Sequence, residues 1–592
     1  MSIPPRTSPR SPPSSSGSPW AARLWLAGIT ALVTVAVGVL VVRTGWLKNE
    51  SPKADPRAAE AFPLPPISAS PYRNTGPDAT YVGSGVCQSC HGDRHDSFRH
   101  SGMGRSMAEL DPAAEPADAV YDHSASRRRY EVYRKDGKLW HRELLLAAGP
   151  AEVTLSEYPV KYVIGSGRHS RSYLVEAEGF LVESPVTWYT ARKAWDMSPG
   201  YDVPDQVGFE RATGEGCLNC HAGRAEAIDG SLHRMKVIEA AIACERCHGP
   251  GSLHAARQSG RLPATKRDPD TFDDTIVNPA RLPRDLAEAI CQQCHLRPTA
   301  VVVARGRKPS DFRPGLPLQD FLHAYEFEDP DAAMTVVGHV EQLHLSKCYR
   351  GSKTLTCLTC HSPHSEPEPK DRLVYYQGAC LGCHQLTACK VSGERRQKES
   401  PNNDCVQCHM PHSPTEIPHL AFTHHRIGVH DQAKAGGAGG RRGGGELRPF
   451  FDLARVGEVD QKRSLGLGYL EAANREKDAA RAVFLRERAL GLLSAARSAG
   501  LPDSVLDVAL ARLSFDTGLG DPLPHAERAL ARPGLVGQER CNALFLRADA
   551  LSALGHHAEA VAALRELTRL RRHSTDWLLL ADCEKALGHE PA

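Results

Sequence analysis

The chain has 592 residues, of which 72 are Lys or Arg and 70 are Asp or Glu, so its formal net charge is only +2. This balance leaves no basic excess for binding DNA or RNA, and we expect no nucleic-acid partner. With 24% charged residues, the composition is that of an ordinary soluble body.

An apolar run without charged residues occupies positions 24–42. As a helix rising about 1.5 Å per residue it would be about 28 Å long, which is enough to cross the core of a bilayer. We therefore predict a cytoplasmic disordered tail at 1–23, a transmembrane anchor at 24–42 and a Pro-rich linker at 43–80. A cleaved signal peptide is the alternative, but no Ala-x-Ala site directly follows this long run.

The sequence Cys-x-x-Cys-His occurs seven times within residues 81–430. Two thiols at this spacing can form thioether bonds to the two vinyl groups of one porphyrin, and the adjoining histidine can bind the iron. A four-cysteine zinc site consumes such pairs two at a time and gives no reason for the histidine. The repeat predicts seven covalently attached haem c groups, held by Cys87, Cys90, His91, Cys217, Cys220, His221, Cys244, Cys247, His248, Cys291, Cys294, His295, Cys357, Cys360, His361, Cys380, Cys383, His384, Cys405, Cys408 and His409.

Haem attachment also predicts the compartment. Thioether bonds are completed on the outer side of the bacterial cytoplasmic membrane, so residues beyond about 50 must be exported while the amino terminus stays inside. We expect a single-pass protein of the cytoplasmic membrane whose haem-binding part lies in the periplasm or on the outer face.

The first two motifs are about 130 residues apart, and part of this interval alternates as β-strands do. Such patterns surround an Asp-Gly turn at 136–137 and a Gly-Ser-Gly turn at 165–167. We predict a small β insertion at about 120–185 in a body that is otherwise mainly α. The last three motifs are too close together for a polypeptide core between them, so porphyrins and short helices must pack against one another.

Each haem iron has a sixth ligand position. Of 28 histidines, seven belong to the motifs, whereas the whole chain has seven methionines. The surplus of histidine makes two histidines per iron the default expectation, which suits low-potential electron transfer.

Four phrases resemble a known family: Cys-Glu-Arg-Cys-His-Gly-Pro-Gly-Ser-Leu-His at 244–254, Cys-His-Ser-Pro-His at 360–364, Cys-His-Met-Pro-His at 408–412 and His-His-Arg-Ile at 424–427. They are similar to the cytochrome c-552/4 group, which contains the tetrahaem electron acceptor of hydroxylamine oxidoreductase and is related to pentahaem nitrite reductase. The resemblance implies a mostly helical body with haems in parallel and perpendicular pairs. No Cys-x-x-Cys-Lys motif occurs, so the lysine-ligated catalytic haem of pentahaem nitrite reductase has no counterpart.

The same resemblance implies distal ligands. His254 and His364 are the first candidates, because the corresponding histidines of similar cytochromes reach a neighbouring haem. The next candidates are His100, His412, His419, His424 and His425. For each of them, a histidine that binds no iron is the alternative.

The end of the chain predicts a separate helical part. A Gly-rich segment at 431–446 indicates a flexible linker. Within residues 447–592 a 33-residue step relates two sets of residues, namely Leu544, Ala548 and Gly555, and Trp577, Ala581 and Gly588. This step is typical of a tetratricopeptide repeat, which usually binds a peptide or protein. A structural cap on the cytochrome body is the alternative.

Four cysteines lie outside the motifs. Cys348 and Cys389 fall in the exported body and form either one disulfide or two free thiols. Cys541 and Cys583 fall on predicted helices, where we expect them to act as small hydrophobic residues.

Two functions fit this sequence. The first is a heptahaem electron carrier between redox protein partners. The alternative is a multihaem oxidoreductase that acts on hydroxylamine, nitrite or a sulfur oxyanion at one open haem site. The sequence assigns no catalytic residue.

Overall fold

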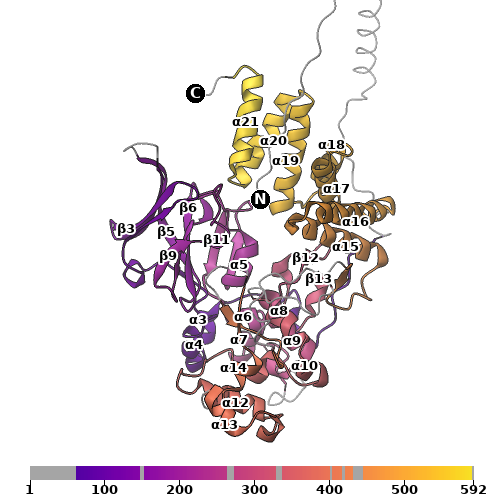
Figure 1. Cartoon of the computed structure of the whole chain (residues 1–592). Helices are drawn as coiled ribbons and strands as arrows, with labels where there is room; N and C mark the ends of the chain where they lie inside the picture. The colour runs from indigo at the N-terminus through magenta and orange to yellow at the C-terminus, as the bar shows by residue number, and fades with distance from the viewer. Residues whose placement is uncertain are drawn as a thin grey trace, which may run out of the picture. The chain divides into compact units, whose positions relative to one another are not determined.

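The computed structural model describes residues 62–146, 152–262, 272–327, 337–399, 403–415, 421–430 and 445–589 (Figure 1). All of them belong to one compact unit, Pro56–Ala592. The predicted anchor at 24–42 and most of the 431–446 linker lie outside the described residues. Among the helices that are described, none has the length and apolar character needed to span a bilayer.

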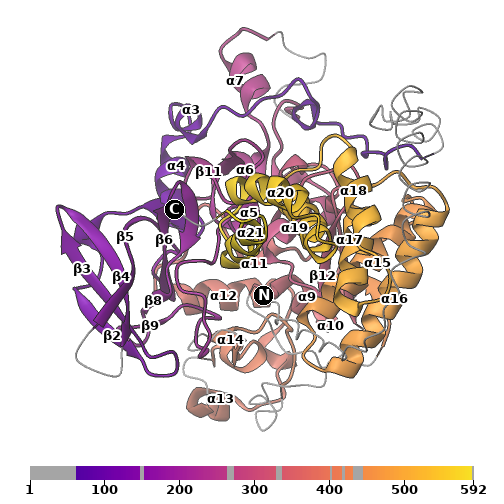
Figure 2. The ribbon, with the colours of Figure 1, turned by 90° about the horizontal axis from the view of Figure 1, so that it is seen from above.

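A nine-stranded sheet follows the first motif, and it is larger than the small insertion predicted at about 120–185. Its neighbouring strands run in the order β2-β3-β4-β5-β6-β8-β9, while β1 pairs with β5 and β7 with β6 (Figure 2). The strands are β1 (Met107–Glu109), β2 (Ala119–His123), β3 (Arg128–Lys135), β4 (Lys138–Leu146), β5 (Glu152–Ile164), β6 (Ser170–Ala177), β7 (Phe180–Glu183), β8 (Val186–Tyr189) and β9 (Ala194–Met197).

The expectation of a mainly α fold is therefore corrected to a mixed fold. The predicted turn between β3 and β4 is confirmed: Asp136 and Gly137 have φ of 51° and 71°, as a tight hairpin requires. The four-residue strands β7, β8 and β9 are too short to give a clear alternating pattern, which is why the sequence did not predict them.

The sheet encloses its own core. Tyr130, Val132, Leu139 and Tyr173 are buried there with Trp195. The outer strands β2 and β9 lie close together: the hydroxyl of Tyr121 on β2 donates a hydrogen bond to Asp196 on β9 at 2.7 Å. The sheet thus curls almost into a closed form, and it folds around contacts that do not involve the motifs.

Short helices carry the seven motifs. In chain order the helices of this part are α3 (Ser84–Gln88), α4 (Gly92–Arg99), α5 (Glu215–His221), α6 (Glu245–His248), α7 (Ser252–Gln258), α8 (Arg284–His295), α9 (His339–His344), α10 (Lys347–Gly351), α11 (Cys357–Cys360), α12 (Arg372–Leu381), α13 (Gly393–Glu399) and α14 (Cys405–His409). Small antiparallel sheets connect them: β10 (Arg224–Ala227) with β11 (Met235–Glu239), and β14 (His412–Pro414) with β15 (Ala421–Thr423).

The carboxy-terminal part is helical, as predicted. Its helices are α15 (Glu458–Arg475), α16 (Ala479–Ser498), α17 (Ser504–Thr517), α18 (Leu523–Ala531), α19 (Gly537–Ala553), α20 (His557–Leu570) and α21 (Ser574–Ala586). Small residues let neighbouring helices approach: a Cβ on Gly466 of α15 would lie 2.8 Å from Leu493 of α16. Cys541 and Cys583 are buried in the core of α19–α21, which confirms their prediction as small hydrophobic residues.

The helical part shares a core with the haem-binding body. Strand β16 (Leu447–Pro449) pairs with β13 (Leu322–Phe327), which also pairs with β12 (Ala300–Val303). Tyr325 and Phe327 are buried against residues of α15, α16 and α17. At the far end, the Leu570 carbonyl accepts hydrogen bonds from Ser231 Oγ at 2.6 Å and from the backbone of Leu232 at 3.0 Å. The two parts are therefore joined at both ends of the helical domain.

A buried ion pair strengthens this junction. Arg305 of the body and Asp460 of α15 form two hydrogen bonds of 2.7 and 2.9 Å, and their side chains are 6% and 11% exposed. We expect Asp460→Ala to lower the free energy of unfolding by about 3–5 kcal/mol, because Arg305 would stay buried without its partner. Urea unfolding followed by circular dichroism measures this change.

A control variant is available on the same helix. Glu458 pairs with Lys462 in solvent, with side chains 81% and 43% exposed. Exposed pairs contribute little, so Glu458→Ala is expected to leave the urea midpoint unchanged. Equal shifts for the two variants would contradict a special role for the buried pair.

Candidate haem-binding site

Helical geometry explains how each motif presents its groups. Residues three positions apart lie on the same face of a helix, so the two thiols of each motif point in one direction. Helix α5, for example, contains the whole second motif, from Cys217 to His221. Each motif thus offers two thiols and an imidazole to one flat group.

All seven motifs open into one cavity of about 4500 Å³. Of the motif cysteines and histidines, all except Cys383 line it. Single ligand sites measure roughly 300–1,000 Å³, so seven of them require roughly 2,000–7,000 Å³. The cavity therefore has the size needed for seven haem groups packed together.

Thiols of different motifs lie next to one another. The motifs are numbered 1 to 7 in chain order. In four pairs of motifs, two thiols are close enough to shift each other's pKa: Cys87 with Cys244 (motifs 1 and 3), Cys220 with Cys294 (2 and 4), Cys291 with Cys357 (4 and 5), and Cys380 with Cys405 (6 and 7). In the first pair, the neighbouring Cys87 thiol lowers the pKa of Cys244 to about 6.

Two further contacts complete the series. The neighbouring Cys357 thiol and burial raise the pKa of Cys291, and the charge of Cys247 raises it further. Cys247 of motif 3 therefore lies near Cys291 of motif 4. Burial raises the pKa of Cys360, and neighbouring thiols including Cys383 raise it further. Cys383 of motif 6 therefore lies near Cys360 of motif 5. Through these contacts each motif lies next to at least one other, and all seven form one connected series.

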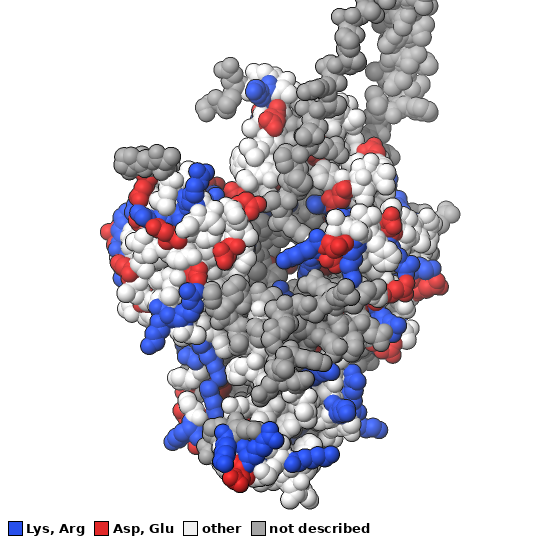
Figure 3. Space-filling view, in the orientation of Figure 1, with Lys and Arg blue, Asp and Glu red and all other residues white. Residues whose placement is uncertain are grey.

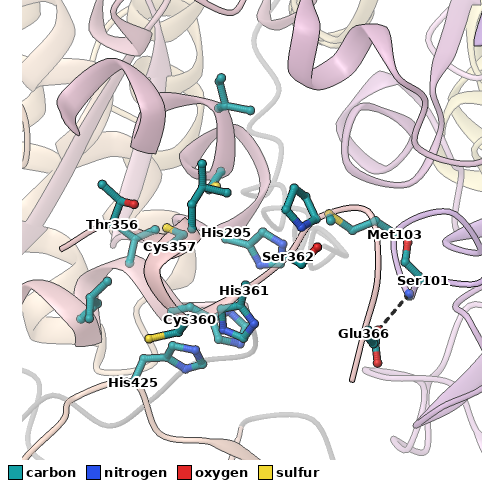
Figure 4. A pocket seen from close by; sticks show the side chains of 18 of the residues that line it. Ser101, Met103, His295, Thr356, Cys357, Cys360, His361, Ser362, Glu366 and His425 are labelled. Carbon is teal, nitrogen blue, oxygen red and sulfur yellow. Dashed lines mark hydrogen bonds between the residues drawn. The ribbon is translucent and has the colours of Figure 1, made fainter. Parts of the chain in front are cut away.

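Three motif histidines face a second imidazole. The ring centres of His91 and His254 are 6.4 Å apart with planes inclined by 20°. The corresponding values are 6.0 Å and 13° for His248 with His364, and 6.2 Å and 25° for His361 with His425, which Figure 4 shows side by side. These three partners were among the candidates that the sequence indicated.

Hydrogen bonds orient several of these rings. The Nδ1–H of His254 donates to Asp273 at 2.8 Å, and that of His248 donates to the carbonyl of Val277 at 2.8 Å. The Nδ1–H of His409 donates to the Gly428 carbonyl at 2.9 Å. A bond of this kind leaves Nε2 free to bind a metal and fixes the direction in which it points.

Burial keeps the rings neutral. It lowers the pKa of His295 to about 4 and that of His425 to about 3. It also lowers the pKa of His248 and His361 below the ordinary value. Neutral imidazoles carry the lone pair that a metal ion requires, so no proton competes for these nitrogens at neutral pH.

The other candidate histidines lie in different places. His412 and His424 line the cavity, and the ring of His424 is 5.3 Å from that of His430. His100 is exposed and lies outside the cavity lining, with its Nδ1–H donating to the Asp96 carbonyl at 2.7 Å. His419 lies outside the described residues.

The structure adds residues that the sequence did not indicate. His339 of α9 lies 5.2 Å from His295, with ring planes at 74°, and 4.5 Å from His425. His169, the residue before β6, lines the cavity beside Phe422. Neither residue lies in a recognisable sequence motif, and the surplus of histidine was the only indication of them in the sequence.

Cys348 and Cys389 are free thiols that line the cavity. Each lies near a motif cysteine. Burial is the largest cause of the raised pKa of Cys360 and of Cys405, and the nearby Cys348 and Cys389, respectively, raise these pKa values further. The two cysteines are thus not bridged in this structure.

Part of this site is similar to a known family. The family described as cytochrome c554 and c-prime matches residues 191–249, which include motifs 2 and 3. A solved structure, that of the outer cell wall cytochrome OcwA, aligns with a TM-score of 0.33 and 15% identity over 76% of this chain and 98% of its own. Among curated proteins there is no match.

The motifs, the cavity they share and the matched family define the class: the chain is a c-type cytochrome that binds haem and transfers electrons. The family match covers about a tenth of the chain.

Proposed function

We propose that the protein is a membrane-anchored periplasmic cytochrome with seven haem c groups that carries electrons between redox protein partners. The spacing of paired imidazoles is the observation that carries this proposal. An iron bound by two histidines has metal–nitrogen bonds of about 2 Å on each face, which places the ring centres about 6 Å apart. Three pairs at 6.0, 6.2 and 6.4 Å match this requirement.

The remaining parts of the proposal have their own support. The apolar run at 24–42 supports a single-pass anchor in the cytoplasmic membrane, and thioether attachment supports a periplasmic location. The helix pairs α15–α21 and the 33-residue step support tetratricopeptide repeats with a protein or peptide ligand.

The residues present fit haem c. When bound, the haem iron supplies one-electron redox chemistry, and the chain sets its potential through axial ligands and burial. Here the motif thiols would hold each porphyrin and the three stacked pairs of imidazoles would bind iron, while Asp273 accepts the hydrogen bond that orients the His254 ring. Burial raises the pKa of Asp273, but hydrogen bonds from Thr275 and His254 together hold it below its usual value. The carboxylate is therefore charged and can accept from the ring.

The haem count tests the assignment. Purified from a host with a haem-attachment system, the protein is expected to carry seven covalent haems, since each motif supplies two thiols and a proximal imidazole. Intact mass spectrometry measures the number. Fewer than six haems after full maturation, or haem that acid-acetone extracts, would contradict the proposal.

One observation favours the enzyme alternative, an oxidoreductase of a small nitrogen or sulfur compound. Among the described residues, four motif histidines have no second imidazole stacked on them as His91, His248 and His361 do. They are His221, His295, His384 and His409; the ring of His339 meets His295 edge-on, at 74°. An iron without a distal histidine can bind a substrate. A high-spin haem in the unmodified protein, coupled to turnover of hydroxylamine, nitrite or a sulfur oxyanion, is the result that would establish this function.

A further inference from the structure

Helix α12 has two different faces. Leu373, Tyr376 and Cys380 line the haem cavity. Val374 and Tyr375 do not line it, and they are 69% and 40% exposed. The outer face also has open space at Gly378, where a Cβ would meet nothing within 4 Å. The outer face of α12 is therefore an open apolar strip that backs directly onto motif 6.

A single residue ties α12 to α13. The backbone carbonyl of Asn403 accepts a hydrogen bond from Gln377 of α12 at 3.2 Å, and its side-chain oxygen accepts one from Arg396 of α13 at 2.8 Å. Both helices lie at the lower end of the molecule in Figure 1. Asn403 therefore links α12 and α13 within one area at this end.

This area is basic, although the whole chain is almost neutral. Residues 345–399 contain nine Lys or Arg and five Asp or Glu. Lys370 precedes α12, Lys390 precedes α13 at the rim of the haem cavity, and Lys398 lies on α13, where it pairs with Glu394 at 3.0 Å. All three lysines are exposed. In Figure 3, blue side chains outnumber red ones at the end that carries α12 and α13. Basic side chains thus border the apolar strip.

We propose that this surface, defined by Val374, Tyr375, Lys370, Lys390 and Lys398 and called the α12 patch, docks an acidic redox protein that exchanges electrons with the haem of motif 6. The proposal rests on the proposed function as an electron carrier. A small apolar centre with a charged rim is the form of a transient protein interface, and opposite charges accelerate the encounter. Only the thickness of one helix, about 10–12 Å with side chains, separates such a partner from the haem cavity.

The dimensions favour a protein over a lipid surface. A helix that binds a membrane buries a long apolar face along its whole length. The outer face of α12 offers two large apolar side chains, Val374 and Tyr375, next to two glycines, Gly378 and Gly382. An area of this size suits a small protein contact.

Charge reversal at the patch tests the proposal. The triple variant Lys370→Glu, Lys390→Glu and Lys398→Glu is compared with a control of the same net charge, Lys138→Glu, Lys236→Glu and Lys477→Glu, whose exposed lysines lie outside residues 345–399. The optical spectrum verifies that each variant carries its haems. The probes are plant plastocyanin, an acidic electron acceptor, and mitochondrial cytochrome c, a basic one.

Stopped-flow oxidation of the reduced protein gives the first measurement. At low salt we expect plastocyanin to react about tenfold or more faster with the unmodified protein than with the patch variant, and added salt to remove the difference. The control variant is expected to stay within about twofold of the unmodified protein. Equal losses in both variants, or faster reaction with cytochrome c, would overturn the proposal.

Binding gives the second measurement and separates the two proposals. Copper-free plastocyanin cannot accept electrons, so surface plasmon resonance with it reports docking alone. Weaker binding of the patch variant supports the patch even if the electron-carrier proposal fails. Electron transfer to both probes without any effect of the patch variant refutes the patch and leaves the carrier function standing. Loss of binding to anionic phospholipid vesicles, with plastocyanin binding unchanged, would identify a lipid surface instead and refute the docking proposal.

Discussion

Replacing His254 with alanine is expected to change one haem in seven of the oxidised protein from low spin to high spin. The His254 ring faces His91 at 6.4 Å and is oriented by Asp273, so its removal takes the distal ligand from motif 1 and leaves the covalent bonds intact. Low-temperature electron paramagnetic resonance measures the added high-spin signal relative to the unmodified protein. Carbon monoxide should then bind the same fraction of the reduced haem.

His100→Ala is the matched control. His100 was also a candidate ligand from the sequence, but its side chain is exposed and lies outside the cavity lining. We expect this variant to keep the spectrum of the unmodified protein. If His100→Ala produces the high-spin haem and His254→Ala does not, the pairing of His91 with His254 is wrong.

The covalent part of the site could be predicted from the sequence because its chemistry is local. Two thiols and an imidazole within five residues must meet one porphyrin, whatever the rest of the chain does. His254 and His364 could be proposed from short phrases, since each follows a motif closely. The structure places both opposite motif histidines distant in sequence, His91 and His248.

Other features depend on contacts between distant residues. His339 meets His295 across 44 positions, and no local pattern marks it. The sheet extends past the predicted 120–185 because β8 is held by pairing with β6, and β9 by pairing with β8, rather than by their own periodicity. The close approach of α15 to β13 depends on Gly468, where a Cβ would lie 3.1 Å from Tyr325. The sequence alone does not show which side chain packs against such a glycine.

The Gly-rich segment led to an expectation of an independent helical domain, yet the contacts indicate a shared core. Val302, Tyr325 and Phe327 of the body are buried with residues of α15–α17. Each such side chain contributes about 1.5–3 kcal/mol when buried, so the three together contribute about 5–9 kcal/mol. That is comparable with the whole stability of a domain, about 5–15 kcal/mol.

Deleting residues 446–592 is therefore expected to destabilise the haem-binding body. The deletion exposes Tyr325 and Phe327, removes strand β16 from β13 and leaves Arg305 without Asp460. We expect the truncated protein to aggregate, or to melt at least 10 °C lower by circular dichroism, which follows from a loss of several kcal/mol.

A cut without a deletion provides the control that separates lost contacts from lost connectivity. A protease site placed within residues 433–445 divides the chain between its two parts but keeps every contact described here. We expect the two fragments to elute together in gel filtration with an unchanged haem spectrum, because β16, the Arg305–Asp460 pair and the Leu570 carbonyl hold them. Fragments that separate, with a haem-binding body that melts at its original temperature, would instead show that the helical domain is an independent module on a flexible linker.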